Sequence, residues 1–581
     1  MNRPDSLRAN KWQVAPTVPF SIQQKLGHIH PVLLQVLYNR GISKPADIQA
    51  FLEGRYLEST DPFLLPDIDK AVARIQQAIK NDEMIIVYGD FDADGVTATV
   101  LLTEALRGLG LSRQQVQPYI PNRVDEGYGL NSESLTTLRA RGAGLVISVD
   151  CGIRSLAEVT HAREIGLDVI VTDHHNLGGM LPPAVAVVNP KRSDSQYPED
   201  RLAGVGIAFK LAQALRLAMP ERAAFSDTDF LDLVAIGTVA DLAPLLGENR
   251  KLVQDGLKVL NQTRRPGLSA LARVARLPGN SLTAESIAFG IGPRINAAGR
   301  LAHAYAAAKL LAVNNSIEAN KLALELNELN RKRQRLTNEL GTKAEAMVDP
   351  SAPILIAADS DFFSGVVGLV ASRLAEKNYR PSIVIEQGEE ESRGSCRSIT
   401  EFHITEALDE AADLLVRHGG HAQAAGFTVR NENLPRFIDR ITEIAHLKLG
   451  NLDLQPTITV DAEIELESID WALYENLAQI EPTGYANPMP VFMSRGIEVA
   501  SHRVVGQNGS HLQLILSNGQ SAGSGPNSGH SVFPAIAFRQ GAWANCLPQY
   551  IDIVYTVGVN EWNGRRNLQL LIQDIRPATA P

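Results

Sequence analysis

Continuous hydrophobic runs alternate with longer amphipathic stretches in the first half of the chain. The runs that begin at residues 85, 145 and 169 (IIVYG, LVISV and VIVT) are apolar throughout, which is typical of strands buried on both faces of a parallel sheet. Amphipathic stretches such as 96–110 and 155–166 lie between them and are predicted to be helices. From about 68 to 245 the pattern predicts an α/β fold with a doubly wound parallel sheet.

Acidic residues follow each of these three runs. The residues concerned are Asp90, Asp92, Asp94, Asp150, Asp173, His174 and His175. In an open parallel sheet the carboxyl ends of the strands line one crevice, so these side chains are expected along a single edge. So many carboxylates repel one another unless cations neutralise them. Carboxylate oxygens with a few imidazoles are ligands for Mn²⁺ or Mg²⁺, so the pattern indicates a metal-dependent hydrolase.

Each of these motifs also has a structural interpretation. The stretch 90–98 could be an Asx-rich turn with a helix cap, although an EF-hand loop is excluded because its twelfth position is not acidic. Asp150 could cap the following helix, whereas an acid and two adjacent histidines at a strand end rarely serve a core. A further apolar helix is predicted at 230–245, where Asp241 is a charge on a face that should be buried and therefore requires a partner.

The rest of the chain divides by its pattern. The stretch 316–347 is charged, amphipathic and free of proline, and a helix of that length spans on the order of 45 Å. We interpret it as a connector between two lobes, with a surface helix of the second lobe as the alternative. The predicted parts are an N-terminal segment, a catalytic α/β domain, the connector, a second α/β domain and a β-rich barrel or sandwich, at 1–67, 68–315, 316–347, 348–450 and 455–581. A Gly/Ser-rich loop at 519–531 is expected to be disordered at its tip.

Composition narrows the class of protein only modestly. With 44% hydrophobic and 21% charged residues the chain is predicted to be a globular cytoplasmic protein, with no secretory signal or membrane span. Its three cysteines form no CxxC pair, which argues against a disulfide framework or a zinc knuckle. The net charge of −10 argues weakly against a protein that coats nucleic acid, but a nuclease needs only a local basic track.

Four motifs in order carry a resemblance to a known family. DFDADG (90–95), SVDCG (148–152), VTDHH (171–175) and GTVADL (237–242) match the motifs of the DHH phosphoesterase superfamily. Within it the chain resembles the bacterial single-strand-specific exonucleases over nearly its whole length. The stretches 482–492 and 562–574 resemble the OB-fold domain of that branch, with Ala486 at a position where glycine is expected. A second small departure is Cys396 within the resembling stretch GSCRS (394–398), where a small or polar residue would also fit.

The resemblance implies a two-metal centre. Its ligands would be Asp92, Asp94, Asp150, His174 and Asp241, with Asp150 bridging the ions and Asp90 as a further ligand or a residue that supports one. Two ions about 3.5–4 Å apart can clamp the attacking and leaving oxygens of an in-line displacement, and one of them would generate hydroxide from water. His175 would stabilise charge or donate a proton at the scissile phosphate, and Asp173 would orient the histidines.

Arginines in the resembling stretches are candidates for phosphate recognition, because the guanidinium fork binds two oxygens at once. Arg123, Arg294 and Arg300 are expected in Gly- and Asn-rich loops, where surface salt bridges are the alternative. Arg397 with Ser395 is predicted to form a pocket for a terminal 5′ phosphate, and Gly420 to let the backbone at His421 approach a nucleotide, a simple turn being the alternative. The full set of expected substrate contacts is Arg123, Arg294, Asn296, Arg300, Arg373, Ser395, Arg397, Gly420 and His421.

Two other basic features are weighed differently. The run RKRQR at 331–335 is interpreted either as a contact to backbone phosphates or as a solvated helix face. The glycines of 202–209 with Lys210 superficially suggest a nucleotide-binding loop, but their spacing fails the P-loop pattern and ATP binding is rejected.

The function implied by the resemblance is a two-metal 5′-to-3′ exonuclease that degrades single-stranded DNA to 5′ mononucleotides in repair and recombination. Strand polarity and the preference for DNA follow from the resemblance alone. Single-stranded DNA is the expected partner, together with a single-strand-binding protein or a helicase, and the chain is expected to be a monomer. One alternative is a DHH phosphodiesterase of oligoribonucleotides or cyclic dinucleotides, whose members are shorter and lack the C-terminal region. The other is a non-catalytic replication scaffold, in which metal ligands would be lost.

Overall fold

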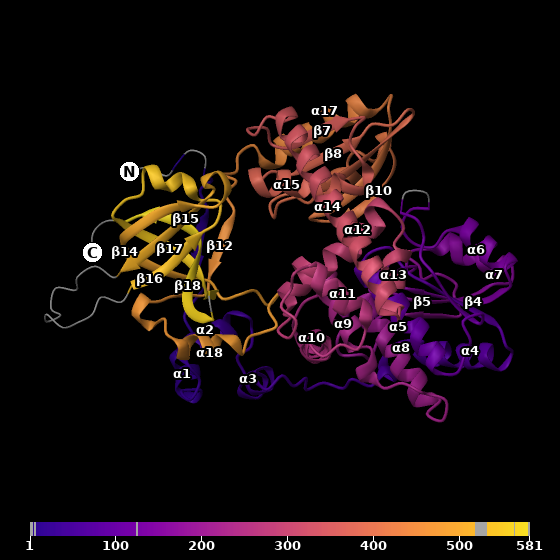
Figure 1. Ribbon diagram of the computed structural model, residues 1–581. Coiled ribbons are helices and arrows are strands. Elements are labelled where there is room, and N and C mark those ends of the chain that lie inside the picture. The colour runs from indigo at the N-terminus through magenta and orange to yellow at the C-terminus, as the bar shows by residue number, and fades with distance from the viewer. Residues whose placement is uncertain (1–3, 5–6, 124–125, 518–531, 563, 579–581) are drawn as a thin grey trace. The chain divides into compact units, whose positions relative to one another are not determined.

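The chain folds into two compact units, which are described separately. The computed structural model describes residues 4, 7–123, 126–517, 532–562 and 564–578. Unit 1 comprises residues 1–57, 455–483 and 487–581, and unit 2 comprises residues 58–454 and 484–486. Figure 1 shows unit 2 built from α/β layers and unit 1 built around a strongly curved sheet.

A five-stranded parallel sheet forms the first part of unit 2. Its order is β3-β2-β4-β5-β6, so the three strands predicted from the hydrophobic runs are adjacent. The strands are β2 (Met84–Tyr88), β3 (Val116–Tyr119), β4 (Ala143–Val149), β5 (Asp168–Thr172) and β6 (Ala186–Val188). The flanking helices are α4 (Ile68–Lys80), α5 (Ala93–Gly108), α6 (Ser132–Ala140), α7 (Leu156–Glu164) and α8 (Gly204–Ala218).

Side chains on the two faces of this sheet enter different cores. Ile85 and Val87 of β2 are fully buried in a core that includes residues of α4, α5 and α8. Ile86 and Tyr88, which alternate with them, are buried in a second core with residues of α6 and α7. Strands covered by helices on both faces confirm the predicted doubly wound sheet.

Further helices extend this part of the unit, and they correct two expectations. They are α9 (Leu231–Ala240), α10 (Gly247–Leu260), α11 (Pro266–Val274), a π-helical turn (Ser286–Ile291), α12 (Gly292–Leu301) and α13 (Tyr305–Ala312). The helix predicted at 230–245 ends at Ala240, because Leu242 adopts a left-handed φ of 59° and Pro244 follows, so Asp241 is the C-cap.

The second correction concerns two of the arginines. Arg294 and Arg300 lie on helix α12 rather than in loops. Pro293 at the start of this helix and the alanines within it favour helix, while its glycines permit close packing. A Cβ at Gly299 would lie 2.3 Å from the Phe91 carbonyl oxygen.

The predicted connector is confirmed as one helix, α14 (Ser316–Met347). It packs against α11, α12 and α13 of the first part and against α15 (Ser364–Asn378) of the next. A second α/β layer follows, with sheet order β10-β11-β9-β8-β7, in which only β7 and β8 are parallel. Its other elements are β7 (Leu355–Asp359), β8 (Ser382–Glu386), β9 (Glu391–Arg397), α16 (Ile404–Asp409), β10 (Leu415–His421), β11 (Ala424–Arg430) and α17 (Leu434–Leu449).

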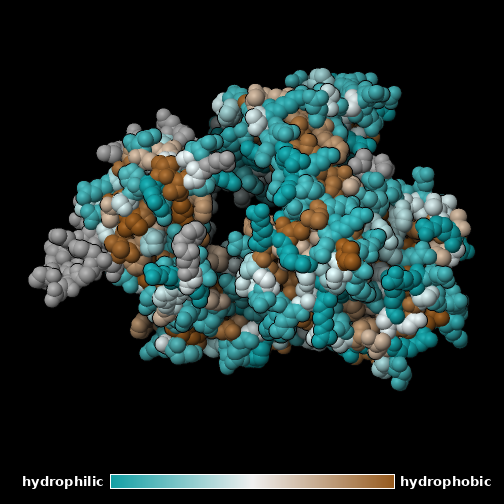
Figure 2. All heavy atoms as spheres, in the orientation of Figure 1, coloured by the Kyte–Doolittle hydropathy of each residue, from teal (hydrophilic) through white to brown (hydrophobic). Residues whose placement is uncertain are grey.

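Unit 1 is built on a six-stranded sheet, with order β13-β14-β15-β16-β18-β17. An additional pairing of β14 with β17 closes it, so the β-rich region is a barrel and not a sandwich. The strands are β12 (Thr457–Val460), β13 (Ala462–Glu463), β14 (Phe492–Val505), β15 (His511–Ser517), β16 (Val532–Ala537), β17 (Tyr550–Trp562) and β18 (Arg565–Pro577), and helix α18 (Trp471–Ala478) lies between β13 and β14 in the chain. Figure 2 shows hydrophobic side chains gathered over the part of the barrel where Figure 1 labels β14, β15 and β17.

N-terminal residues complete unit 1. Strand β1 (Lys11–Val14) pairs in parallel with β12, and helices α1 (Phe20–Lys25), α2 (Pro31–Asn39) and α3 (Pro45–Leu52) follow it. Arg576 of β18 lies 3.9 Å from the Trp12 ring centre, and Trp12 Nε1 donates to Asp574, so the N-terminal strand is fastened to the barrel. The remaining short 3₁₀ helices of the chain are Pro62–Leu64, Asp227–Asp229, Ala412–Leu414, Leu466–Ser468, Gln507–Gly509 and Gly541–Asn545.

Three smaller expectations from the sequence can be compared with the structure. Ala486, at the position where glycine is expected, has a φ of 61°, which L-residues with a side chain rarely adopt. The Gly/Ser-rich loop 519–531 lies outside the described residues. Among the helices that the structure describes, none combines the length and apolarity needed to span a bilayer.

Candidate metal centre

Carboxylates and imidazoles from four elements meet at the carboxyl edge of the parallel sheet. The acids of the DFDADG motif follow β2, Asp150 follows β4, and the two histidines follow β5. Asp241 joins them from the end of α9. Three groups in this cluster bring ligand atoms within 4.8 Å of one another, namely Asp150–His174–His175, Asp94–His174–Asp241 and Asp90–Asp92–Asp150. Because Asp150 and His174 each belong to two groups, the groups form one continuous centre.

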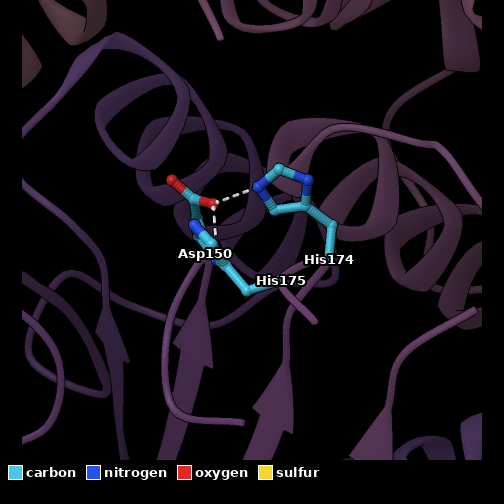
Figure 3. A group of neighbouring side chains, drawn as sticks. All are labelled: Asp150, His174 and His175. Atoms are coloured by element: carbon cyan, nitrogen blue, oxygen red, sulfur yellow. Dashed lines mark ion pairs between the residues drawn. The ribbon is translucent and has the colours of Figure 1, made fainter. Parts of the chain in front are cut away.

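One carboxylate oxygen of Asp150 faces both histidines (Figure 3). Its Oδ1 atom is 3.1 Å from His174 Nε2 and 3.9 Å from His175 Nδ1. His174 Nε2 is also 3.7 Å from Oδ2 of Asp241 and 4.0 Å from Oδ2 of Asp94. A single imidazole nitrogen therefore faces carboxylate oxygens from three different elements of the fold.

Several of these atoms are buried without a hydrogen-bond partner in the described parts of the chain. They are Asp90 Oδ1, Asp150 Oδ1 and His174 Nε2. A buried polar atom without a partner is costly, and lone pairs that converge from carboxylates and a neutral imidazole are the donor set of a divalent cation. Asp150 itself has a φ of 61°, a strained conformation of the kind that occurs at functional sites. The residues present thus fit divalent metal ions.

The pKa values of the clustered side chains also indicate a site for divalent metal ions. Burial, followed by repulsion from Asp92, raises the pKa of Asp94 to about 7, and burial with repulsion from Asp94 raises the pKa of Asp241 to about 9. Burial and neighbouring carboxylates also raise the pKa of Asp90 and of Asp150 well above the usual range. Burial and the neighbouring His175 lower the pKa of His174 to about 3, so this imidazole is neutral and able to ligate a metal. Without a cation the centre would hold protons in place of charge.

The turn after β2 is both a helix cap and part of the centre. Asp92 is the N-cap of α5, and its Oδ1 accepts hydrogen bonds from the backbone N–H groups of Asp94 and Gly95. The structural interpretation of DFDADG therefore holds together with the functional one. Asn296 contributes from α12, because its Oδ1 accepts a hydrogen bond from the Ala93 N–H at 2.7 Å. This predicted substrate contact holds the loop that carries the acids.

The N-terminus of α8 supports the centre in a way that the sequence patterns do not reveal. The backbone N–H groups of Gly204 and Val205 donate to the two carboxylate oxygens of Asp94 at 2.7 and 2.8 Å. A Cβ at Gly204 would lie 2.5 Å from the Asp150 Cβ, so only glycine fits there. The spacing of the glycines in LAGVG excludes a P-loop, but it does not reveal this contact. A glycine at the start of a helix that follows a strand edge could have indicated a close approach of that kind.

Rejection of ATP binding at this segment is supported. The Lys210 ammonium is buried and lies 2.6 Å from the Glu248 carboxylate, so its charge is already neutralised within the protein. Glu248 also accepts a hydrogen bond from the Tyr197 hydroxyl at 2.5 Å. Lys210 is therefore part of the packing of α8.

His175 is oriented by Asp173. The Asp173 Oδ1 atom is 2.7 Å from His175 Nδ1 and accepts from the His175 backbone N–H, and Oδ2 accepts from the Ile153 N–H. Although burial opposes it, the hydrogen bond and charge of Asp173 raise the pKa of His175 above its usual range. The Tyr128 hydroxyl also lies 3.2 Å from His175 Nδ1, a neighbour that sequence reasoning missed although it lies only five residues after the predicted contact Arg123.

Three of the predicted arginines gather beside the acidic edge. Burial, followed by the charges of neighbouring arginines, lowers the pKa of Arg300 to about 10, and those neighbours include Arg123 and Arg397. Burial also lowers the pKa of Arg123, which Asp90 and Asp92 partly offset. No ion pair joins these three guanidiniums to a carboxylate within the described ranges. Buried cations that lie together and form no direct ion pair with a carboxylate are a candidate anion site.

The other predicted contacts have varied surroundings. Arg294 donates to Asn327 Oδ1 at 3.1 Å, and burial with Arg331 and Arg333 of the RKRQR run lowers its pKa. Ser395 lies next to Arg397 on β9, with 3.4 Å between Oγ and Nη1. Arg373 is held by α14, since it donates to Asn338 at 2.9 Å and its Nε is 3.5 Å from Glu345, both on that helix.

The Gly-His pair occupies the edge strand of the second sheet. Gly420 has a φ of 153°, and a Cβ there would lie 2.3 Å from the Ala424 carbonyl oxygen, so the β10–β11 pairing itself requires glycine. Burial, followed by the charges of Arg154, His175 and Lys191, lowers the pKa of His421. His421 therefore lies within electrostatic reach of the residue that Asp173 orients.

Comparisons with known proteins agree with this organisation. Three family models match: the DHH family N-terminal domain over residues 84–238, the DHHA1 domain over 351–447 and the RecJ OB domain over 460–574. The single-stranded-DNA-specific exonuclease RecJ of Bacillus subtilis (strain 168) is 37% identical over 554 residues, covering 94% of this chain and 68% of that protein. The protein of the same name from Dickeya dadantii (strain 3937) is 35% identical over 573 residues, covering 94% and 96%.

A solved structure shows the same fold. The crystal structure of RecJ in complex with Mn²⁺ from Thermus thermophilus matches with a TM-score of 0.83 and 31% identity, covering 98% of this chain and 80% of that one. The matches to the DHH and DHHA1 models cover the parallel sheet and the second α/β layer of unit 2, and they place this chain in the DHH class of proteins. Within that class the chain belongs to the RecJ family. The OB-fold expected from the C-terminal stretches is confirmed as the barrel of unit 1.

Proposed function

We propose that this protein is a metal-dependent exonuclease that degrades single-stranded DNA from the 5′ end and releases 5′ mononucleotides. The observation that carries the proposal is the adjacency of two sites in unit 2. An acidic centre fitted to divalent ions lies within electrostatic reach of arginines that have no carboxylate partner among the described residues. The acidic centre is complementary to metal ions, and the arginines beside it are complementary to the negative charge of a phosphodiester. The names of the relatives, single-stranded-DNA-specific exonucleases, support the substrate class.

The residues divide into ligands and supports. Asp90, Asp92, Asp94, Asp150, His174 and Asp241 would hold two ions, with Asp150 shared between them. Bound Mn²⁺ or Mg²⁺ would supply a water of lowered pKa and Lewis-acid stabilisation of the phosphate oxygens. Solved RecJ structures with Mn²⁺ and with Mg²⁺ support both ions as cofactors. The backbone N–H groups of Gly204 and Val205 would hold the Asp94 carboxylate in place, so that its oxygens stay positioned for the metal from one turnover to the next.

His175 would act on the scissile phosphate. Its raised pKa keeps a proton on the ring at a higher pH than in a free histidine, and the contact between Asp173 and Nδ1 fixes the orientation of the ring. A protonated imidazole held beside a phosphate can stabilise developing negative charge or donate to a leaving oxygen. The Tyr128 hydroxyl would further restrain the same ring.

The 5′-to-3′ direction of degradation would follow from the arginine cluster. Arg397 and Ser395 on β9, with Arg123 and Arg300, would bind a terminal 5′ phosphate, and the scissile bond would then lie at the acidic edge. Arg294 and Arg333 would contact phosphates farther along the strand. The RKRQR run would therefore belong to the DNA track, although Arg331 is ion paired with Glu328.

The cellular setting belongs to the same proposal. We place the enzyme in the cytoplasm, as a monomer that acts in DNA repair and recombination with a single-strand-binding protein or a helicase. A role as a short phosphodiesterase of oligoribonucleotides or cyclic dinucleotides is not favoured, because the chain carries the RecJ OB domain. A non-catalytic scaffold is not favoured either, because all candidate ligands are present and close together.

Digestion of end-labelled oligonucleotides tests the proposal directly. Single-stranded DNA and RNA, each labelled at the 5′ or the 3′ end, are incubated with Mn²⁺, Mg²⁺ or EDTA. We expect labelled mononucleotide to appear at once from 5′-labelled DNA, a shortening ladder from 3′-labelled DNA, and no product in EDTA. Immediate mononucleotide from the 3′ label would reverse the polarity, and absence of any hydrolysis with either metal would refute the enzymatic assignment.

A further inference from the structure

The end of strand β6 brings a further group of polar side chains to the metal centre. β6 pairs in parallel with β5, so the residues after it reach the same carboxyl edge as the two histidines. Asn189 follows β6 directly and is fully buried. Its Nδ2 donates to the His175 carbonyl oxygen at 3.0 Å, and its Oδ1 accepts from the Lys191 backbone N–H at 2.9 Å. Asn189 therefore joins the loop after β6 to the loop that carries the histidines.

The Lys191 side chain lies beside the histidine loop. Its Nζ donates to Oδ1 of Asn176, the residue after His175, at 3.2 Å. Arg154 Nε donates to the carbonyl oxygen of the same Asn176 at 3.0 Å. Burial, followed by the charges of Arg154, His175 and Lys191, lowers the pKa of His421, so positive charge converges beside this loop. Because an ammonium has three N–H groups and one contacts Asn176, the other two can contact an anion.

The acids that interact with Lys191 all have other partners. Burial lowers the pKa of Lys191, and the charges of Asp200, Asp173 and Asp241 partly offset this. Asp173 is hydrogen bonded within the histidine loop, Asp241 is a candidate metal ligand, and Asp200 lies 3.6 Å from the Arg201 guanidinium. Metal ions would neutralise Asp241, which leaves the Lys191 ammonium as a net positive charge at this end of the centre.

Lys191 and the arginine cluster adjoin different acids of the centre. Arg123 of the cluster interacts with Asp90 and Asp92 after β2, whereas Lys191 interacts with Asp173 after β5 and with the C-cap residue of α9. The two groups of cations therefore lie at different parts of the acidic edge. A strand with its 5′ phosphate in the arginine cluster and its scissile phosphate at the metal ions would continue toward the lysine.

We propose that the Lys191 ammonium binds the phosphate that follows the scissile phosphate on the 3′ side, and so holds the strand against the metal centre. A contact to the backbone phosphate is independent of base sequence. Asn176 and Asn189 hold Lys191 and His175 in a fixed relation, so this contact aligns the strand with His175. The inference rests on the proposed function, because it takes the DNA strand as the ligand and numbers its phosphates from the 5′ end.

Removal of single phosphate charges from the ligand tests this contact. The probe is a 5′-phosphorylated hexathymidylate with a 3′ fluorophore, bound by the full-length protein in EDTA and measured by anisotropy. Two further probes carry a neutral methylphosphonate at the second or the third linkage, the first linkage being the scissile one. Lys191→Met should weaken binding of the fully charged probe by about 3- to 30-fold. The same substitution should weaken binding of the second-linkage probe by less than about twofold, whereas the third-linkage probe should show the full loss.

Three other variants complete the comparison. Lys191→Arg should bind within about threefold of the wild type, because it keeps the charge. Lys191→Gln repeats the test with a polar side chain, so the result does not depend on how methionine is accommodated. Lys80→Met is the matched control and should bind all three probes as the wild type does. Lys80 is exposed in the last turn of α4, just before the amino end of β2 and thus at the opposite edge of the sheet.

The possible outcomes are distinct. An equal loss on all three probes would overturn the proposal, because Lys191 would then act through the histidine loop and not on one phosphate. No loss on any probe, or a loss that only the third-linkage methylphosphonate cancels, would overturn it as well. With Mn²⁺, Lys191→Met should raise KM for the charged hexanucleotide and change kcat by less than about threefold, since the contact supplies binding and not chemistry. Absence of hydrolysis by the wild type would instead overturn the exonuclease proposal and leave the binding result in EDTA standing.

Discussion

The Nε2 atom of His174 lies 3.1 Å from Oδ1 of Asp150, and neither buried atom has a hydrogen-bond partner within the described residues. The two atoms are close enough to share one cation. With the pKa of His174 lowered by burial to about 3, the imidazole nitrogen presents a lone pair and not a proton. The pair is therefore arranged for coordination, and it links the two groups of ligands on either side of it.

Replacing Asp150 should separate folding from metal binding. In Asp150→Asn we expect exonuclease activity to fall by at least about 100-fold, because a shared ligand is lost. Mn²⁺ at 100 times its Kd should raise the free energy of unfolding of the wild type by about 2.7 kcal/mol, and this increase should largely disappear in the variant. The metal-free variant should be at least as stable as the metal-free wild type, because a buried carboxylate surrounded by others is removed. Thermal unfolding with EDTA and with Mn²⁺ measures both effects.

Asp232→Asn is the matched control for this experiment. Asp232 is also buried in unit 2, but its carboxylate is 3.3 Å from the Arg265 guanidinium and lies outside the metal groups. Loss of one partner of a buried ion pair should lower the stability of the metal-free protein, while the increase produced by Mn²⁺ should remain. Equal Mn²⁺ stabilisation of Asp150→Asn and wild type would exclude Asp150 as a ligand.

The metal-free centre should make stability depend on pH in a defined direction. Asp94 and Asp241 have pKa values of about 7 and about 9 in the folded state, both above the usual value of about 3.9 in an unfolded chain. The folded state therefore binds more protons, so the free energy of unfolding falls as pH rises from about 4 to about 9. The slope reaches at most about 1.4 kcal/mol per pH unit for each group.

Denaturant titrations in EDTA and in Mg²⁺ between about pH 6 and pH 9 measure this dependence. Mg²⁺ replaces the protons, so its stabilising effect should grow with pH over the same window. Asp241→Asn should flatten the upper part of the EDTA profile, where its own pKa of about 9 lies. An EDTA profile in which stability rises over the upper half of that window would contradict the account of a proton-holding, metal-free centre.

Gly204 should be intolerant of even one methyl group. A Cβ there would lie 2.5 Å from the Asp150 Cβ and 2.6 Å from its Oδ1, so Gly204→Ala must displace the carboxylate or the start of α8. A misplacement of about 1 Å in a catalytic site costs about 100-fold in rate, and we expect a loss of that order in kcat. Gly206→Ala is the control, because its Cβ would meet nothing closer than Leu202 at 3.4 Å. Comparable activity of the two variants would show that the close approach is not required.

Much of the centre follows from the sequence because strand ends are readable. Buried strands of a parallel sheet give uninterrupted apolar runs, and the residues after them must share one edge, so the pattern correctly predicts that Asp150 and His174 lie together. The long helix α14 is equally readable, since amphipathic periodicity persists without proline from Ser316 to Met347.

Features that depend on close approach in space are not readable. The role of Gly204 arises from the distance between α8 and the end of β4, which no local pattern encodes. Glycines and an asparagine around Arg294 and Arg300 give turn signals, whereas packing against Phe91 and α14 stabilises a helix there. The pattern places Asp241 inside a helix because the apolar run continues past the residue where the backbone turns.

Arg397 should distinguish phosphorylated from unphosphorylated 5′ ends. Burial lowers the pKa of Arg397, the neighbouring charge of Arg123 adds to this effect, and its Nη1 lies beside Ser395 Oγ. A dianionic terminal phosphate relieves that repulsion and a hydroxyl does not. We expect Arg397→Ala to raise KM for 5′-phosphorylated DNA by about 10- to 100-fold, the cost of about 1.5–3 kcal/mol for a charged hydrogen bond. KM for 5′-hydroxyl DNA should change by less than about threefold.

Arg393→Ala tests whether this effect belongs to the pocket. Arg393 lies on the same strand, β9, but its side chain is exposed. Within the described chain the Ser395 hydroxyl is hydrogen bonded to Arg397 and not to Arg393. We expect this variant to treat both ends as the wild type does. Steady-state kinetics on matched phosphorylated and hydroxyl oligonucleotides measure the ratio of the two KM values. If Arg397→Ala raised KM equally for both ends, Arg397 would be a general contact to the backbone, and recognition of the 5′ end would have to reside in Arg123 or Arg300.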